Sequence, residues 1–144
     1  MVDFLYDIYR VNQLGEDTHT YVDTDDDVIG VFFVDEADDA PNQTSDQDVA
    51  DRAAAAQVPS FASAPNLANT TVAAVSNRAV FDADDLTFTA LTGDQVESFD
   101  IFKDTGTDTT SVLMLNMDTA TGLPLTPSGG DVVIVWNPSG IWRL

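Results

Sequence analysis

VIGVFFV, at residues 28–34, is the most strongly strand-forming segment of the chain. It is rich in β-branched and aromatic residues, which favour extended backbone on a packed sheet. Acidic residues bound it on both sides, at 25–27 before it and at Asp35 after it. A continuous apolar run of this length, without alternation, is typical of a strand that is covered on both faces. We therefore expect a central strand at 28–34.

Beyond residue 69 the pattern predicts a series of short strands separated by turns. The separators contain residues that favour turns, as in TGD at 92–94 and NPSG at 137–140. Short strands at this spacing are typical of β-sandwiches and barrels. The expected fold class is mainly β, a single-domain antiparallel β-sandwich or barrel over residues 1–144. The expected strands of this β-meander, which spans 70–144, lie at 71–75, 78–81, 86–91, 96–103, 112–117, 131–136 and 141–144.

A short N-terminal helical arm is expected over residues 1–15, MVDFLYDIYRVNQLG. Phe4, Leu5 and Ile8 recur at helical spacing, and a glycine at 15 is placed to end the helix. The aromatic residues of this segment, among them Tyr9, need a surface to pack on. The arm is therefore expected to dock on the body of the protein or on a neighbouring subunit.

Residues 36–69 are rich in Asp, Ala, Asn, Gln, Ser and Pro, and they predict a long loop excursion. Within it, Ser45 is placed to cap a short helix over 46–56. Acidic residues fill the first turn of that segment and alanines follow, which favours helix formation. We expect one short helix inside this acidic loop.

The charge balance excludes several classes of partner. The chain has 25 Asp and Glu against 5 Lys and Arg, a formal net charge of −20. Nucleic-acid binding draws on clustered Lys and Arg, and attraction to anionic membranes needs the same residues, so neither partner is expected. The excess of Asp is compatible with a saline habitat, because it keeps a protein hydrated when salt screens its charges. No apolar run approaches the roughly 18 residues of a membrane span, and no basic leader is present, so a soluble, cytosolically made protein is expected.

The residues needed for catalysis are sparse. His19 is the single histidine, and no motif pairs it with a serine nucleophile. The chain has no cysteine, so it has no disulfide, thiolate metal site or cysteine nucleophile. Neither of the common glycine-rich phosphate loops is present. We expect no enzymatic activity and no cofactor.

An acidic stretch at 23–27 is a weak metal candidate. Asp23, Asp25 and Asp27 match the first alternate ligands of a calcium loop, but Val28 stands where the loop needs glycine and Val34 where it needs glutamate. We interpret the stretch as a solvated acidic turn, with loose cation binding as the alternative. The DADD sequence at 82–85 offers the same two interpretations, and there too a turn is favoured.

Four segments of the second half resemble a family of small virion proteins encoded by tailed phages. They are DADDLTFTA at 82–90, IFKDTGT at 101–107, TATGLPLTPSGGD at 119–131 and WNPSGIWRL at 136–144. The first half also resembles the family in order, with an N-terminal helix, an Asp-rich turn, an apolar strand ending at Asp35 and a variable acidic and alanine-rich stretch. Two features depart from the family pattern: Ser128 stands where Asn is commoner, and a Pro-Ser-Gly turn lies between the two tryptophans.

The resemblance implies a non-enzymatic structural role in the virion, with no active residues to carry over. A protein of charge −20 is repelled by packaged DNA, which favours the outer surface of the capsid. We expect a decoration or cement protein that contacts the major capsid protein and itself, as a homotrimer. Two alternatives stay open: a head–tail connector or tail component, and a calcium-dependent or glycan-binding adhesion module. The candidate interface residues are Phe4, Leu5, Ile8, Tyr9 and Trp142, and a sugar-stacking role for the tryptophans is the alternative to core packing.

Overall fold

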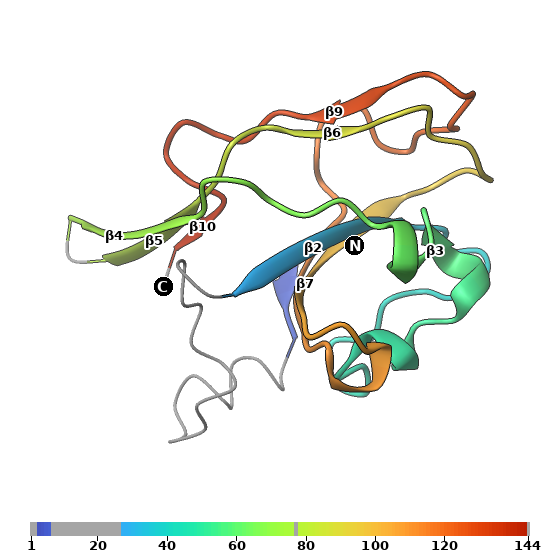
Figure 1. Ribbon diagram of the computed structural model, residues 1–144, viewed down its shortest axis with the longest axis horizontal. Helices are drawn as coiled ribbons and strands as arrows, with labels where there is room; N and C mark the ends of the chain where they lie inside the picture. Colours follow the sequence, from blue (N-terminus) through green and yellow to red (C-terminus); the bar gives the residue numbers. More distant parts are fainter. Residues whose placement is uncertain (1–2, 7–26, 77, 144) are drawn as a thin grey trace.

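The computed structural model describes residues 3–6, 27–76 and 78–143, and in them the chain is mainly β, with antiparallel sheets (Figure 1). One sheet has five strands in the order β1-β8-β7-β2-β3, a second has three in the order β10-β5-β4, and β6 pairs with β9. The described strands do not close into a barrel. Their bounds are β1 (Phe4–Leu5), β2 (Val28–Val34), β3 (Gln57–Val58), β4 (Thr71–Val75), β5 (Arg78–Asp82), β6 (Leu86–Phe88), β7 (Ser98–Asp104), β8 (Leu113–Met117), β9 (Val132–Ile134) and β10 (Trp142–Arg143).

Strand β2 is the centre of the largest sheet. It pairs with β7 along its whole length, and β3 pairs with its other edge. Ile29, Val31 and Phe33 pack into one buried cluster, whereas Phe32 and Val34 pack into a second cluster on the opposite face. The prediction of a central strand covered on both faces at 28–34 is confirmed.

The two clusters lie on the two sides of this sheet. On one side, β6 and β9 run across β2 and β7 and form a layer above them (Figure 1). Aromatic rings join this layer to the sheet: the Phe33 and Phe88 ring centroids are 4.7 Å apart, and those of Phe99 and Trp136 are 5.9 Å apart. On the other side, the segment between β2 and β4 supplies Val49 and other residues that cover the sheet.

A glycine inside β2 makes room for a ring of the neighbouring strand. Gly30 lies opposite Phe102 of β7, and a Cβ atom at Gly30 would lie 2.3 Å from that ring. Phe102 is fully buried and cannot turn away into solvent. The glycine that weakens the strand pattern locally is therefore required by packing.

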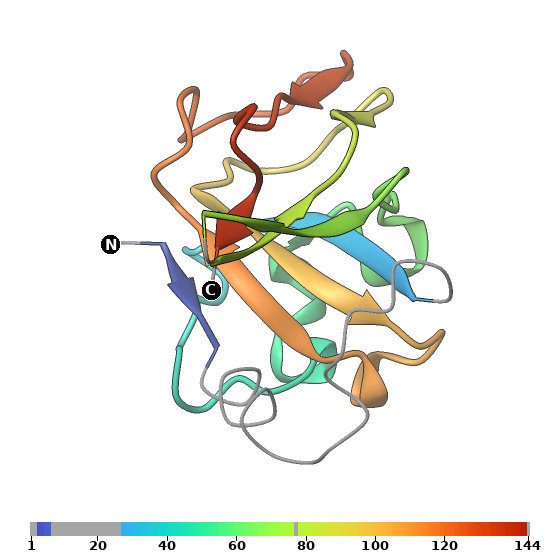
Figure 2. The same ribbon diagram turned by 90° about the vertical axis from the view of Figure 1, so that its left-hand side faces the viewer.

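The prediction of a helix over 1–15 is wrong where the structure can test it. Phe4–Leu5 forms strand β1, which pairs antiparallel with β8, beside it in Figure 2. The ladder continues past the strand, because the Tyr6 N–H donates to the Met114 carbonyl at 3.2 Å. Pairing with the edge of β8 satisfies backbone groups that a helix would satisfy internally. Residues 7–15 lie outside the described residues.

The prediction of a helix over 46–56, capped by Ser45, is also wrong. The segment contains two 3₁₀ turns, η1 (Val49–Asp51) and η2 (Ala54–Ala56). Asp48 caps η1, with Asp51 completing a reciprocal capping box. Arg52 then has extended backbone, with φ −86° and ψ 123°, which ends the turn before the alanines. The contacts of the Arg52 side chain, described below, override the helix propensity of the alanines.

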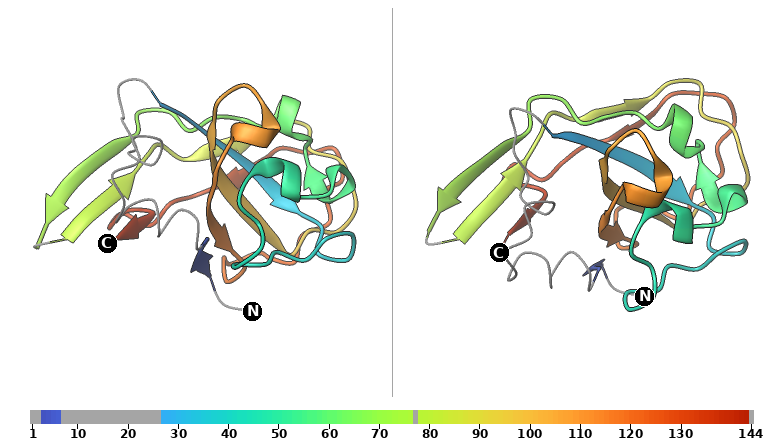
Figure 3. Two further views of the ribbon diagram at one scale, coloured as in Figure 1. Left: turned by 90° about the horizontal axis from the view of Figure 1, so that it is seen from below. Right: turned by 60° about the horizontal axis from the view of Figure 1, so that its bottom comes forward.

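The strands predicted beyond residue 69 are confirmed in position, but not as a continuous meander. Strand β6 pairs with β9 and not with its chain neighbours, with Thr87 opposite Val133. Strands β4 and β5 form a hairpin that continues to β10. The loop at 36–69 contains the short strand β3 and three 3₁₀ turns, the third being η3 (Phe61–Ser63); a further turn, η4 (Asp108–Thr110), lies between β7 and β8. In Figure 3 the β4–β5 hairpin extends from one end of the molecule, and the 3₁₀ turns lie toward the other.

Candidate functional site

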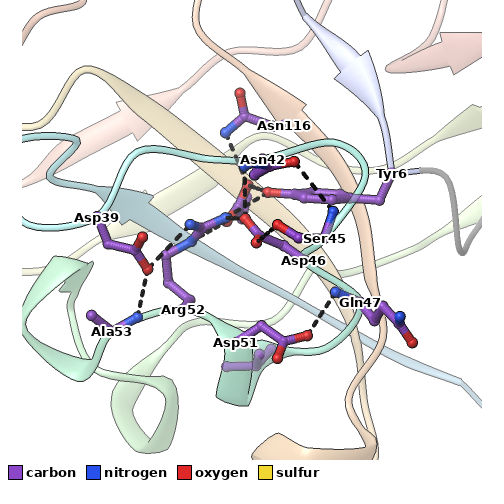
Figure 4. Close-up of polar contacts among 12 residues, drawn as sticks. Tyr6, Asp39, Asn42, Ser45, Asp46, Gln47, Asp51, Arg52, Ala53 and Asn116 are labelled. Atoms are coloured by element: carbon purple, nitrogen blue, oxygen red, sulfur yellow. Dashed lines mark hydrogen bonds and ion pairs between the residues drawn. The ribbon is translucent and has the colours of Figure 1, made fainter.

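A buried arginine organises the most extensive polar cluster among the described residues (Figure 4). The Arg52 side chain has no exposed surface, and its Nε donates to Asp100 Oδ2 at 3.2 Å. Its Nη2 donates to Asp46 Oδ2 at 3.0 Å and to Tyr6 Oη at 2.9 Å. Tyr6 in turn donates from its hydroxyl to Asp100 Oδ1 at 2.7 Å. Side chains from the N-terminal segment, the 36–69 loop and β7 thus meet at one point.

Three further residues complete the cluster. Asn116 Nδ2 of β8 donates to Asp100 Oδ1 at 2.9 Å and to Ser98 Oγ at 3.1 Å. Asp39 Oδ2 lies 3.3 Å from Arg52 Nη1, at the more exposed end of the cluster. We call this set the Arg52 network; its members are Tyr6, Asp39, Asp46, Arg52, Ser98, Asp100 and Asn116.

Burial and charge pairing set the ionisation of the network. Burial raises the pKa of the Asp100 carboxyl, while Arg52 and the hydrogen bonds from Tyr6 and Asn116 oppose that rise. Burial acts to lower the pKa of Arg52, but the charge of Asp100 and of the other carboxylates outweighs it and raises that pKa. Burial, followed by the charge of Asp100, raises the pKa of the Tyr6 hydroxyl above its ordinary value. Arg52 is therefore held as a cation and Tyr6 as a neutral phenol.

The Arg52 network holds separate segments of the fold together. Each charge on Arg52 and Asp100 is matched by a buried partner, and a buried pair of this kind is costly to break from one side only. The network joins β7 and β8 to a loop that has little regular structure, and joins both to the segment after β1. It therefore fixes where residues 3–6 and the loop lie on the sheet.

The predicted metal candidates do not converge in the part of the chain that the structure describes. Asp27 Oδ2 lies 2.8 Å from Lys103 Nζ, in an ion pair between the start of β2 and the end of β7. Asp23 and Asp25 lie outside the described residues. Across 3–6, 27–76 and 78–143 there is no group of three or more His, Cys, Asp or Glu side chains that could hold a metal ion.

The acidic sequence at 82–85 connects β5 to β6 and holds a tryptophan in place. Asp85 Oδ1 accepts from the backbone N–H of Trp136 at 2.9 Å, and the Asp84 carbonyl accepts from its indole Nε1 at 3.0 Å. Asp82 is the last residue of β5 and residues 83–85 form an irregular connection to β6, so the structure does not contain the expected turn. The predicted core packing of Trp136 is confirmed, because its side chain is buried.

Three of the five candidate interface residues lie in the part of the chain that the structure describes, and their positions differ. Trp142 is partly buried and stacks on Phe81, with ring centroids 4.1 Å apart and an interplanar angle of 19°. One face of the indole is thus used within the protein, as core packing requires. Phe4 and Leu5 form β1, and Ile8 and Tyr9 lie outside the described residues.

An apolar cleft of about 700 Å³ lies between the β9 layer and the five-stranded sheet. Phe33 and Phe99 line one side of it and Val132 and Ile134 the other, and none of its lining residues is charged. Residues 119–123 and Leu125 also line it. The cleft offers surface for an apolar group, with threonine hydroxyls and the Asn137 amide as its polar side-chain groups.

Sequence reasoning missed the Arg52 network. Two signals were present: Arg52 is the single cation within 36–69, and Asp100 interrupts the apolar centre of its strand. A lone charge inside an apolar strand predicts a buried partner of opposite sign. The identity of that partner depends on tertiary contacts across 48 positions, which no local pattern encodes.

Comparisons with known proteins give no family for this chain. No family model matches it, and no curated protein matches it. Within the described residues, we find no helix with the length and apolar character that crossing a bilayer requires. The functional proposal therefore depends on the sequence resemblance, the charge and the contacts described above.

Proposed function

We propose that the protein is a non-enzymatic structural component of a tailed-phage virion that decorates the outer surface of the capsid. The observation that carries this proposal is that three of the resembling segments, 82–90, 119–131 and 136–144, are joined to one another by hydrogen bonds. Ala90 N–H donates to Asp131 Oδ1 at 2.9 Å, and Trp136 N–H donates to Asp85 Oδ1 at the same distance. Residues of the resembling segments thus contact one another around the β6–β9 layer.

We further propose that this layer and the five-stranded sheet pack as an open sandwich. The larger buried cluster contains residues of β2, β7 and β8 on one side and of β6 on the other. Such a body presents surface loops on a rigid core, which suits a protein that acts through interface area. The major capsid protein is the proposed partner.

Charge supports the outward location. With a net charge of −20, the protein is repelled by packaged DNA but is compatible with a solvated outer surface. The Arg52 network supports a role for residues 3–6, because it anchors Tyr6 and so holds these residues at the edge of β8. Assembly of copies as homotrimers on the shell is part of the proposal.

The test is quantitative mass spectrometry of purified virions, with the ratio of this protein to the major capsid protein as the readout. A decoration protein is expected near one copy per capsid subunit. A ratio of a few per cent would instead indicate a connector or tail ring of about a dozen copies, since such rings have cyclic symmetry. Absence from the particle would overturn the structural role altogether.

A further inference from the structure

Strand β4 is an edge strand that lacks the usual protection. It is the outer strand of the β10-β5-β4 sheet, and all five of its residues are exposed. Its sequence is TVAAV, with no charge, no proline and no lysine, and Val72 and Val75 are about half exposed. Among the described residues, no strand pairs with its outer edge. Natural proteins block such edges because an unprotected one is a template for pairing with another chain.

The β4 edge lies in a part of the chain with few acidic residues, so two copies of this acidic protein can approach each other there. No acidic residue occurs between Asp51 and Asp82, although the whole chain has 25. In the part of the chain that the structure describes, the two exposed arginines, Arg78 and Arg143, both lie on the sheet that contains β4. This sheet is therefore a neutral to basic patch on a protein of charge −20, and the hairpin carries it away from the body (Figures 1 and 3).

We infer that β4 pairs antiparallel with β4 of a second copy of this chain, about a two-fold axis at Ala73. The hairpin closes at the Val75–Arg78 pair, so the N–H and C=O groups of Val72 and Ala74 point to the outer edge. A two-fold axis at Ala73 sets Val72 opposite Ala74 of the second copy, and these residues exchange the outward hydrogen bonds. The two sheets then become one continuous sheet.

The same register is electrostatically complementary. In each molecule Arg78 lies opposite Val75, and Asp82 lies opposite Thr71. The two-fold axis sets Val75 opposite Thr71 of the second copy. Each row of side chains across the four joined strands therefore runs from Arg78 and Val75 of one molecule to Thr71 and Asp82 of the other. At about 4.8 Å per strand, these opposite charges are about 14 Å apart on the same face.

The β4–β4 contact does not depend on the decoration role. It is compatible with a trimer, because each subunit of a trimer would keep its β4 edge for pairing with a subunit of a neighbouring trimer. A single pair of short strands buries less than the roughly 1,000 Å² of a stable interface, so the pairing is weak in dilute solution. Screening of the net charge strengthens it, since the Debye length falls to about 3 Å at 1 M salt.

Disulfide trapping tests the pairing and its register, because the described residues and the sequence contain no cysteine. In the full-length Ala73→Cys variant, the two Cα atoms would be about 4.5 Å apart, a separation that a disulfide spans. In Thr71→Cys they would be about 14 Å apart, which it cannot span. We expect covalent dimers from Ala73→Cys under mild oxidation in 1 M NaCl, and at least tenfold fewer from Thr71→Cys. No dimers, or equal amounts from both variants, would overturn the inference.

A second measurement removes the dependence on oxidation. Val72→Lys places a charge on the β4 edge, whereas Val133→Lys places one on β9, and the two valines are 51% and 52% exposed. By sedimentation velocity over a concentration series, we expect Val72→Lys to weaken self-association at least tenfold and Val133→Lys to change it less than twofold. Equal self-association of the two variants would contradict the pairing. Neither outcome bears on the copy number in virions, so this inference and the decoration role can fail separately.

Discussion

Replacing Arg52 with methionine should remove the cation on which the buried network depends while keeping most of the side-chain volume. Asp100 would keep its donors from Tyr6 and Asn116 but lose its charge partner, at a site with no exposed surface. Breaking a buried ion pair from one side costs about 3–5 kcal/mol of unfolding free energy. Against a typical total of about 5–15 kcal/mol, the variant is expected to be marginally stable.

The assay is urea denaturation followed by circular dichroism, at pH 7 and at pH 5. Loss of the cation raises the pKa of Asp100 further. A carboxyl whose folded pKa is raised contributes stability that is present at low pH and is lost as the pH rises. The deficit of Arg52→Met should therefore be smaller at pH 5 than at pH 7.

Two controls make the result specific. Arg143→Met removes an exposed arginine that binds only the Ser139 carbonyl in the described contacts, and it should cost less than about 1 kcal/mol. The double variant Arg52→Met/Asp100→Asn neutralises the orphaned carboxylate and should recover part of the loss. A cost for Arg52→Met no larger than that of Arg143→Met would refute the reasoning about the network.

Three further predictions concern single contacts. Tyr6→Phe should abolish part of the stability loss seen above pH 10, because a raised phenol pKa contributes stability that is lost as the pH rises; absorbance at 295 nm should show Tyr6 ionising only with unfolding. Gly30→Ala should cost about 1–3 kcal/mol in a thermal melt through overlap with the Phe102 ring, and Phe102→Leu in the same chain should recover some of it. Asp85→Ala should cost about 1 kcal/mol and alter the Trp136 fluorescence, whereas the exposed Asp94→Ala should do neither.

The strands were largely predictable because their signals are local. The apolar run at 28–34 and the alternation at 86–90 depend on neighbouring residues only, and the structure places β2 and β6 there. The order of strands was not predictable, because the pairing of β6 with β9 joins segments about 45 positions apart. The two helix predictions were wrong for a related reason, because distant segments supply the contacts. Strand β1 gains its hydrogen bonds from β8, and Arg52, within the expected helix at 46–56, is held by side chains from distant segments.

Part of the candidate site was predictable from the sequence, and part was not. The core position of Trp136 follows from the apolar residues before it in the sequence. Its contacts with Asp84 and Asp85 were not predicted, because they lie in an irregular connection between β5 and β6 where a turn was expected. The Arg52 network could be suspected from two isolated charges, but not assembled, because its members come from four separate segments. The exposed edge of β4 could not be predicted from the sequence, because TVAAV predicts a strand equally well at the edge or in the centre of a sheet.

The most direct test of the proposed function is an electron cryo-microscopy reconstruction of the virion that encodes this protein. The account predicts density for the β fold outside the capsid shell, repeated over the lattice, with the acidic surface toward solvent and the N-terminal segment near the capsid subunits. Density for the protein only at a single portal vertex or along the tail, or on the inner face of the shell against the DNA, would contradict it.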